Sequence, residues 1–103
     1  QRQIEALEKP EQWEPKYNIY TPSESKAMRI YSRLVAYVRE YGSDWEADWE
    51  DHEQPKYSVY YSYKISAWSR AYNYRSCTSG TVYMSQHCAV RLANKLNSGE
   101  VVL

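Results

Sequence analysis

Helical and alternating hydrophobic patterns divide this chain into two predicted helices and a group of predicted strands. From residue 22 to about residue 41, apolar side chains recur at spacings of three and four, the pattern of an amphipathic helix. Thr21 can cap this helix, Pro22 suits its first position, and Glu24 can close a capping box. Gly42 is expected to supply a left-handed exit. The predicted apolar stripe consists of Ala27, Ile30, Tyr31, Leu34, Val38 and Tyr41.

The second half of the chain alternates in the way that is typical of strands. Residues 57–68 place Tyr57, Val59 and Tyr61 on one face and polar side chains on the other, which predicts one continuous strand. Further strands are predicted at 70–77 and 81–84, around a turn at 78–80, and a short edge strand at 16–20. Ser85 can cap a second helix that ends at Gly99, and residues 100–103 could add a final strand. The stripe of this helix is Ala89, Leu92, Ala93 and Leu96.

These elements predict an α+β fold, in which an antiparallel sheet of three to four strands carries both helices on one face. The chain has 103 residues, enough for one core, so we expect a single domain over residues 16–103. Residues 1–15 are expected to form a flexible or partly helical arm. Residues 43–54 show no convincing period and are predicted to be a loop. No apolar run is long enough to span a bilayer and the first residues lack a signal peptide, so we expect a cytoplasmic protein without a membrane partner.

A six-residue motif occurs twice in the chain. Residues 15–20 read PKYNIY and residues 55–60 read PKYSVY. The segments that follow the two copies differ. A duplication and a chance similarity between two strands both explain the match.

Charge is sorted along the chain although the formal net charge is zero. Residues 40–53 contain seven carboxylates and no lysine or arginine, whereas residues 54–99 contain six bases and no acid. The sequence therefore predicts a molecule with separate acidic and basic regions, and head-to-tail self-association into a homodimer is one consequence that this sorting allows.

Catalytic and metal-binding chemistry finds no support in the sequence. Cys77, His87, Cys88 and His52 lack the two close ligand pairs of a zinc site. His87 and Cys88 are neighbours on a predicted helix and project about 100° apart, which does not suit a nucleophile and its base. No phosphate-binding loop or nucleophile elbow is present. We expect no enzymatic activity, no cofactor and no metal, and the two cysteines are expected to be reduced thiols.

The first functional hypothesis is a protein-binding module that presents an acidic, tryptophan-bearing loop to a partner protein with a basic surface. Clustered carboxylates repel one another unless they are solvated or neutralised by a partner, and tryptophan is a frequent interface anchor. A solvated loop whose tryptophans fold back on the core is the alternative interpretation. The predicted partner-binding residues are Asp44, Trp45, Glu46, Asp48, Trp49, Glu50, Asp51 and Glu53.

The second hypothesis is direct binding of RNA or DNA by the second half, where bases alternate with aromatic side chains that can stack on nucleobases. The alternative is that the tyrosines pack the sheet and the bases keep it solvated. The residues of this hypothesis are Tyr60, Lys64, Trp68, Arg70, Tyr72, Arg75, Arg91 and Lys95.

Two resemblances bear on these hypotheses. The predicted order of helix, three strands and helix resembles the double-stranded RNA-binding domain, with Pro55, Tyr57 and Val59 opening the first strand. That family has lysines after the serine that opens the last helix, whereas this chain has Gln86 and His87.

The chain also resembles small accessory proteins of bacteriophages and prophages, through Trp13-x-Pro15-Lys16, the acidic middle and residues 82–93. That resemblance implies an inhibitor in the bacterial cytoplasm that docks on the basic groove of a nucleic-acid-handling defence protein, such as a CRISPR effector.

Overall fold

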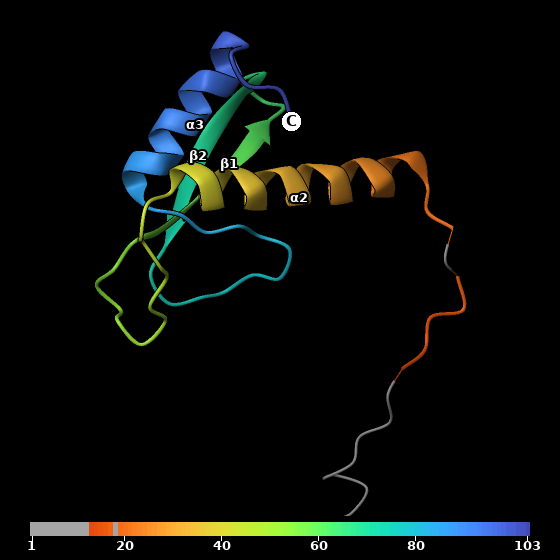
Figure 1. Cartoon of the computed structure of the whole chain (residues 1–103), viewed down its shortest axis with the longest axis horizontal. Helices are drawn as coiled ribbons and strands as arrows, with labels where there is room; N and C mark the ends of the chain where they lie inside the picture. The colour runs from red at the N-terminus through yellow and green to blue at the C-terminus, as the bar shows by residue number, and fades with distance from the viewer. Residues whose placement is uncertain (1–12, 18) are drawn as a thin grey trace, which may run out of the picture.

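The computed structural model describes residues 13–17 and 19–103, and within them the chain forms two helices and an antiparallel pair of strands (Figure 1). The α+β class predicted from the sequence is confirmed. The elements in chain order are α2 (Pro22–Tyr41), β1 (Lys56–Ser62), β2 (Ala67–Asn73) and α3 (Gln86–Ser98).

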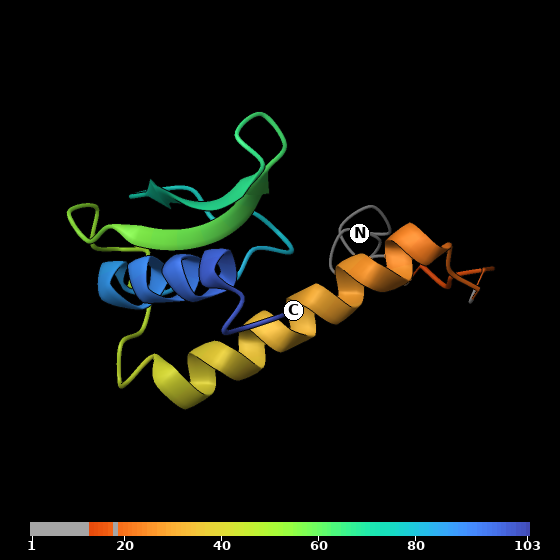
Figure 2. The same cartoon turned by 90° about the horizontal axis from the view of Figure 1, so that it is seen from above.

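The sheet, α3 and α2 lie in three successive layers (Figure 2). Helix α3 packs against both strands of the sheet. Helix α2 lies on the far side of α3 and reaches the core through Leu34, Tyr37 and Val38. Both helices are thus on the same side of the sheet, as expected, but α3 separates α2 from the strands because the hairpin is narrow enough for one helix to cover it.

The start of α2 follows the sequence signals closely. The Glu24 N–H donates to the Thr21 hydroxyl (3.2 Å), and the Thr21 N–H donates to the Glu24 carboxylate (2.8 Å), which completes the capping box. The hydrogen bond from the Thr21 N–H to the carboxylate is the largest cause that holds the pKa of Glu24 below its usual value, and the Thr21 side chain adds to this effect. The predicted capping box is confirmed.

The end of α2 differs from the prediction. Gly42 is the last capping residue, but its φ is −81° and the left-handed residue is Ser43, with φ 59°. Gly42 instead lets its main chain lie close to Val38. The Gly42 N–H donates to the Val38 carbonyl oxygen, and a Cβ at position 42 would collide with that oxygen. The chain therefore reverses one residue later than expected.

The predicted strand at 57–68 is wrong, because it contains a hairpin. Strand β1 ends at Ser62, residues 63–66 turn, and β2 pairs back in register, with Ser62 opposite Ala67 and Tyr57 opposite Tyr72. Ser66 takes the left-handed conformation that the turn requires, with φ 52°. Alternation runs through the turn without glycine, proline or asparagine, so the pattern carries no break signal.

The expected sheet of three to four strands is not formed within the described residues, where the sheet has two strands. The predicted strand at 70–77 is observed at 67–73, and the one at 81–84 is reduced to an isolated bridge between Met84 and Tyr57. Lys16, Tyr17 and residues 19–20 are not in a strand, and residues 100–103 form none either. Most of the predicted arm at 1–15 lies outside the described residues, as does Asn18.

The core is small and centres on α3. Ala89, Leu92, Ala93 and Leu96 are all buried, which confirms the predicted stripe, and Met84 is fully enclosed beside them. The predicted α2 stripe is wrong in part, because Ala27, Tyr31 and Tyr41 are exposed and the buried residue is Tyr37. Only the second half of α2 reaches the core (Figure 1), and in the first half Ile30 is half-buried in a pocket that residues 101–103 also line, whereas Ala27 and Tyr31 stay exposed.

The Tyr37 hydroxyl is buried and has no hydrogen-bond partner in the described part of the chain. Burial raises the pKa of Tyr37 above its usual value of 10.0, Cys88 raises it further and Arg91 opposes the rise. Because the folded protein holds this proton more tightly, the contribution to stability is complete below pH 10.0 and declines as pH rises above it.

We predict that Tyr37→Phe increases the free energy of unfolding by about 1 kcal/mol at neutral pH, because it removes an unpaired buried hydroxyl and keeps the ring. The variant should also lose less stability than the wild type above pH 10.0, since Phe has no proton to release. Urea unfolding at neutral and alkaline pH measures both effects. A destabilised Tyr37→Phe protein would show that the hydroxyl has a partner.

Candidate acidic docking surface

Residues 43–55, between α2 and β1, are shaped by hydrogen bonds of their own side chains. The Asp48 carboxylate accepts from the Glu50 N–H (3.0 Å), and the Asp51 carboxylate accepts from the Glu53 N–H (3.0 Å), which makes two successive turns. The Gln54 amide closes them by accepting from the Asp48 N–H (2.7 Å) and donating to a main-chain carbonyl, that of Glu46 (3.0 Å). This acidic segment is a folded loop.

Burial alternates along the first part of this loop. Trp45, Ala47 and Trp49 are half-buried, whereas the acids between them are exposed. The sequence contains this period of two, so the prediction of a segment without a period is wrong. The exposed carboxylates are named here the acidic ridge, which consists of Asp44, Glu46, Asp48, Glu50, Asp51 and Glu53.

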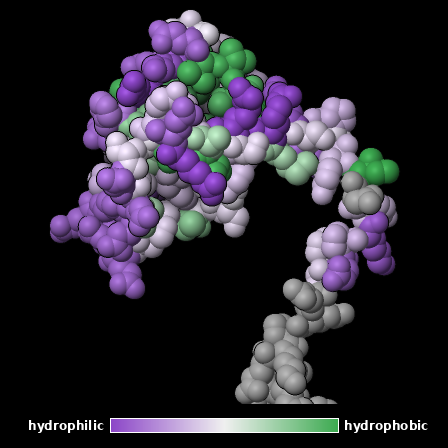
Figure 3. Space-filling model, viewed as in Figure 1, coloured by the Kyte–Doolittle hydropathy of each residue, from purple (hydrophilic) through white to green (hydrophobic). Residues whose placement is uncertain are grey.

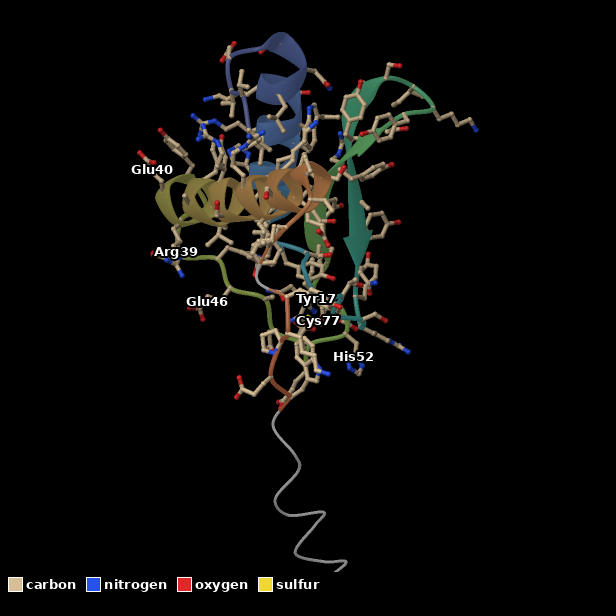
Figure 4. The ribbon with its side chains drawn as sticks, turned by 90° about the vertical axis from the view of Figure 1, so that its right-hand side faces the viewer. Tyr17, Arg39, Glu40, Glu46, His52 and Cys77 are labelled. Carbon is tan, nitrogen blue, oxygen red and sulfur yellow. The ribbon has the colours of Figure 1, made fainter. Side chains whose placement is uncertain are left out.

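The acidic ridge projects from the body of the protein. Figure 3 shows a cluster of hydrophilic side chains at the lower left, where the loop lies in Figure 1. Figure 4 shows Glu46 pointing outward on one side of the loop, near the end of α2 that carries Arg39 and Glu40, and His52 pointing outward on the opposite side. The ridge therefore offers negative charge over a broad arc.

A buried lysine attaches the loop to the sheet. Lys56 is fully buried, and its ammonium group donates to the main-chain carbonyls of Asp51 (2.7 Å) and Tyr74 (3.1 Å). The same group lies 5.1 Å from the ring centre of Trp49, and that ring packs edge-on against Tyr83 at 4.9 Å. Lys56 thus joins the loop, the start of β1 and the segment after β2.

The predicted partner-binding set therefore separates into two parts. All six carboxylates are exposed and lie on one loop, and the two tryptophans lie on its inner side. Trp49 makes its aromatic and cation contacts within the molecule, as in the interpretation that the tryptophans fold back on the core. The carboxylates are the exposed part of the predicted set.

The predicted nucleic-acid set is spread over several surfaces. Tyr60 is on the face of β1 opposite to Val59, whereas Trp68 and Arg70 share the face that carries Val59. The remaining members are Lys64 in the hairpin turn, Tyr72 near the end of β2, Arg75 beyond it, and Arg91 and Lys95 on α3. The structure brings Arg91 and Lys95 together beside Glu100, in a shallow hollow that no residue of the hairpin lines.

An open cleft of about 720 Å³ lies where the acidic loop meets the end of the hairpin. The Tyr72 ring packs 5.4 Å from Tyr57 and 5.7 Å from Tyr74, so three aromatic rings follow one another there. Sequence reasoning missed the cleft because no local pattern links a loop at 52–53 with a strand end twenty residues later. The lining residues are His52, Glu53, Tyr72, Asn73, Tyr74 and Arg75.

The two cysteines are free and differ in environment. Cys77 is exposed, and Cys88 is buried beside Tyr37. Burial raises the pKa of the Cys88 thiol, and Arg91 opposes that rise. Across residues 13–17 and 19–103, no three histidine, cysteine or carboxylate side chains are grouped to hold a metal ion.

Comparison with known proteins adds no assignment. No protein-family model, curated protein or solved structure gives a significant match to the chain. Within the part of the chain that the structure describes, no helix has both the length and the apolar character of a membrane span.

We predict that Lys56→Met lowers the free energy of unfolding by about 2–4 kcal/mol, because two partly buried carbonyl groups lose their donor and Trp49 loses its cation. The matched control is Lys16→Met in the other copy of the motif. Lys16 is exposed, so its replacement should change stability by less than about 0.5 kcal/mol. Urea unfolding followed by tryptophan fluorescence compares the two variants. Equal effects would contradict an anchoring role for Lys56.

We predict that iodoacetamide modifies Cys77 in the folded protein and leaves Cys88 unmodified, because the reactive thiolate of Cys88 is disfavoured by burial. Mass spectrometry after native labelling should find one added group, and labelling in urea should find two. Rapid native modification of Cys88 would show that α2 and α3 separate readily.

Proposed function

We propose that this protein is a non-enzymatic binding module whose acidic ridge docks on the basic surface of a partner protein. The observation that carries the proposal is the placement of six exposed carboxylates on one folded loop, with their aromatic neighbours turned inward. A chain that only needed solubility would gain nothing from concentrating like charges, because their mutual repulsion disfavours the compact state.

Preorganisation supports docking through this loop. The hydrogen bonds that shape the turns at Asp48 and Asp51, and the bond from the Asp48 N–H to the Gln54 side chain, are already formed. Binding of a partner would therefore order few additional residues. Complementary charge mainly accelerates encounter and selects the partner, so the inferred partner surface is strongly basic. Grooves that bind nucleic acid have this property, because they neutralise phosphates with lysine and arginine.

The finer version of the proposal is an inhibitor of phage type. A row of carboxylates in place of phosphates would occupy the groove of a host nucleic-acid-handling or defence protein, in the cytoplasm of a bacterial cell. The resemblance to phage accessory proteins favours this class, and the acidic ridge supplies the chemistry that such a target requires.

The second candidate function is direct binding of RNA or DNA. The cleft beside Tyr72 favours it, since Tyr72 and Tyr74 offer aromatic faces next to the Arg75 guanidinium. Glu53 lines the same cleft and repels phosphate, and Arg91 and Lys95 line a different hollow. The acidic ridge is therefore the preferred surface.

We predict that Glu46→Gln with Glu50→Gln weakens binding to an oligo-arginine peptide by about 2- to 30-fold at low salt, because two exposed charge contacts are lost. The matched control is Glu14→Gln with Glu100→Gln, which changes net charge equally at exposed sites outside the loop. Fluorescence anisotropy across a salt series measures both pairs. Equal losses in the two double variants would contradict a localised docking surface and leave only net charge as the cause.

Fluorescent single- and double-stranded RNA and DNA oligonucleotides, tested in the same salt series, separate the two functions. The acidic-ridge proposal expects no binding. Binding that weakens steeply with salt and is lost on Arg75→Ala would instead establish the nucleic-acid function.

A further inference from the structure

Within the described part of the chain, one edge of strand β2 pairs with no other strand, and main-chain groups face outward along it. The Trp68 N–H donates to the Asn97 side chain (2.8 Å), and the Asn97 amide donates to the Trp68 carbonyl (2.9 Å), so the Trp68 main chain points away from β1. Main-chain direction alternates along a strand, so Arg70 and Tyr72 also direct their N–H and C=O groups outward. The other edge of the sheet agrees with this assignment. Tyr57 lies opposite Tyr72, and its N–H and C=O both bond to Met84, so the main-chain groups of this pair point away from each other.

The open part of this edge is short. Asn97 satisfies the edge at Trp68 in the way that a neighbouring strand would, which leaves the stretch from Arg70 to Tyr72. No hydrogen bond to the outward groups of these two residues is formed among the described residues. Tyr72 is also 60% exposed, although it lies on the sheet face that carries Val59. An exposed edge of this kind is a template for strand addition.

The chain contains a second segment whose sequence is similar to that of the strand that already pairs with β2. Residues 15–20 match residues 55–60 at the proline, the lysine and both tyrosines, with isoleucine in place of valine. In the described structure, Tyr17 is 85% exposed and Ile19 is 88% exposed, and neither is in a strand. A β1-like sequence is thus present without a strand partner.

We propose that residues 16–20 of one copy of this chain add as a strand to the free edge of β2 in a second copy, and that the exchange is reciprocal. The register of β1 is the template, with Tyr17 opposite Tyr72 and Ile19 opposite Arg70. Tyr17 then packs on the Tyr72 ring from the side opposite to Tyr57. Each copy gains the third strand that its own described residues lack.

The geometry of α2 favours exchange between copies over closure within one copy. The segment is joined to the start of α2, and the 20 residues of this helix extend for about 30 Å. The second half of α2 packs on the core through Leu34, Tyr37 and Val38, and the first half runs away from the sheet with the segment at its far end (Figures 1 and 2). In a reciprocal exchange, the free β2 edge of each copy pairs with the segment of the other copy. The dimer then has two-fold symmetry and leaves no such edge open, so it does not extend into fibres.

Amide hydrogen exchange of the full-length protein in dilute and in concentrated solution tests the proposal. Concentration should slow exchange of the Arg70 and Tyr72 amides by about tenfold or more, in step with dimer formation seen by analytical ultracentrifugation. The Ser69 and Ala71 amides face β1 and serve as internal controls whose protection should not change. A monomer at all concentrations, or a dimer with unprotected Arg70 and Tyr72 amides, would overturn the proposal.

A matched pair of proline variants tests the register. Ile19→Pro removes an N–H that would pair with β2 and should abolish the dimer and the added protection. Lys16→Pro removes an N–H that would point away from β2, so its dimer should persist. Both positions are exposed, so neither variant disturbs the core. A dimer that survives Ile19→Pro, or that is lost equally in both variants, would refute the proposed pairing.

Discussion

Burial of the Lys56 ammonium group is the interaction on which the acidic end of the molecule depends. A lysine is expensive to enclose, and this one is satisfied by two carbonyl oxygens and an aromatic ring rather than by a carboxylate. Those partners come from the acidic loop and from the segment after β2. The Lys56 side chain therefore holds these two segments together, although they do not pair with each other as strands. The carboxylates of the acidic ridge stay exposed on the outside of the loop.

The layered arrangement explains why so small a core suffices. Helix α3 is covered by the sheet on one side and by part of α2 on the other. Its short stripe of alanine and leucine is therefore buried between two neighbouring layers. Helix α2 contributes through its second half, which leaves its first half as an extension supported by its own hydrogen bonds and capping box. The acidic ridge therefore follows the end of α2, and the first copy of the repeated motif precedes its start.

Local signals predicted the helices well and the strands poorly. The caps at Thr21 and Ser85 act through neighbouring main-chain groups, so both helix starts could be located without knowledge of the fold. The turn at residues 63–66 could not be located from the sequence, because its residues continue the alternation of the strands. Pairing between β1 and β2 decides where the chain turns back. Residues 43–54 contain no helix or strand, and the inward position of Trp49 in this loop depends on Lys56 and Tyr83, which belong to other segments.

The two copies of the PKYxxY motif show most clearly where the information in the sequence ends. The sequence by itself determined the helix boundaries, the stripe of α3 and the position of the carboxylates, since these follow from contacts between residues a few positions apart. Only the tertiary structure decided that Lys56 is enclosed while Lys16 is exposed, although each follows a proline and precedes a tyrosine. The difference arises because burial of an ammonium group requires carbonyl groups and a ring from distant segments, and the fold brings these to one copy of the motif.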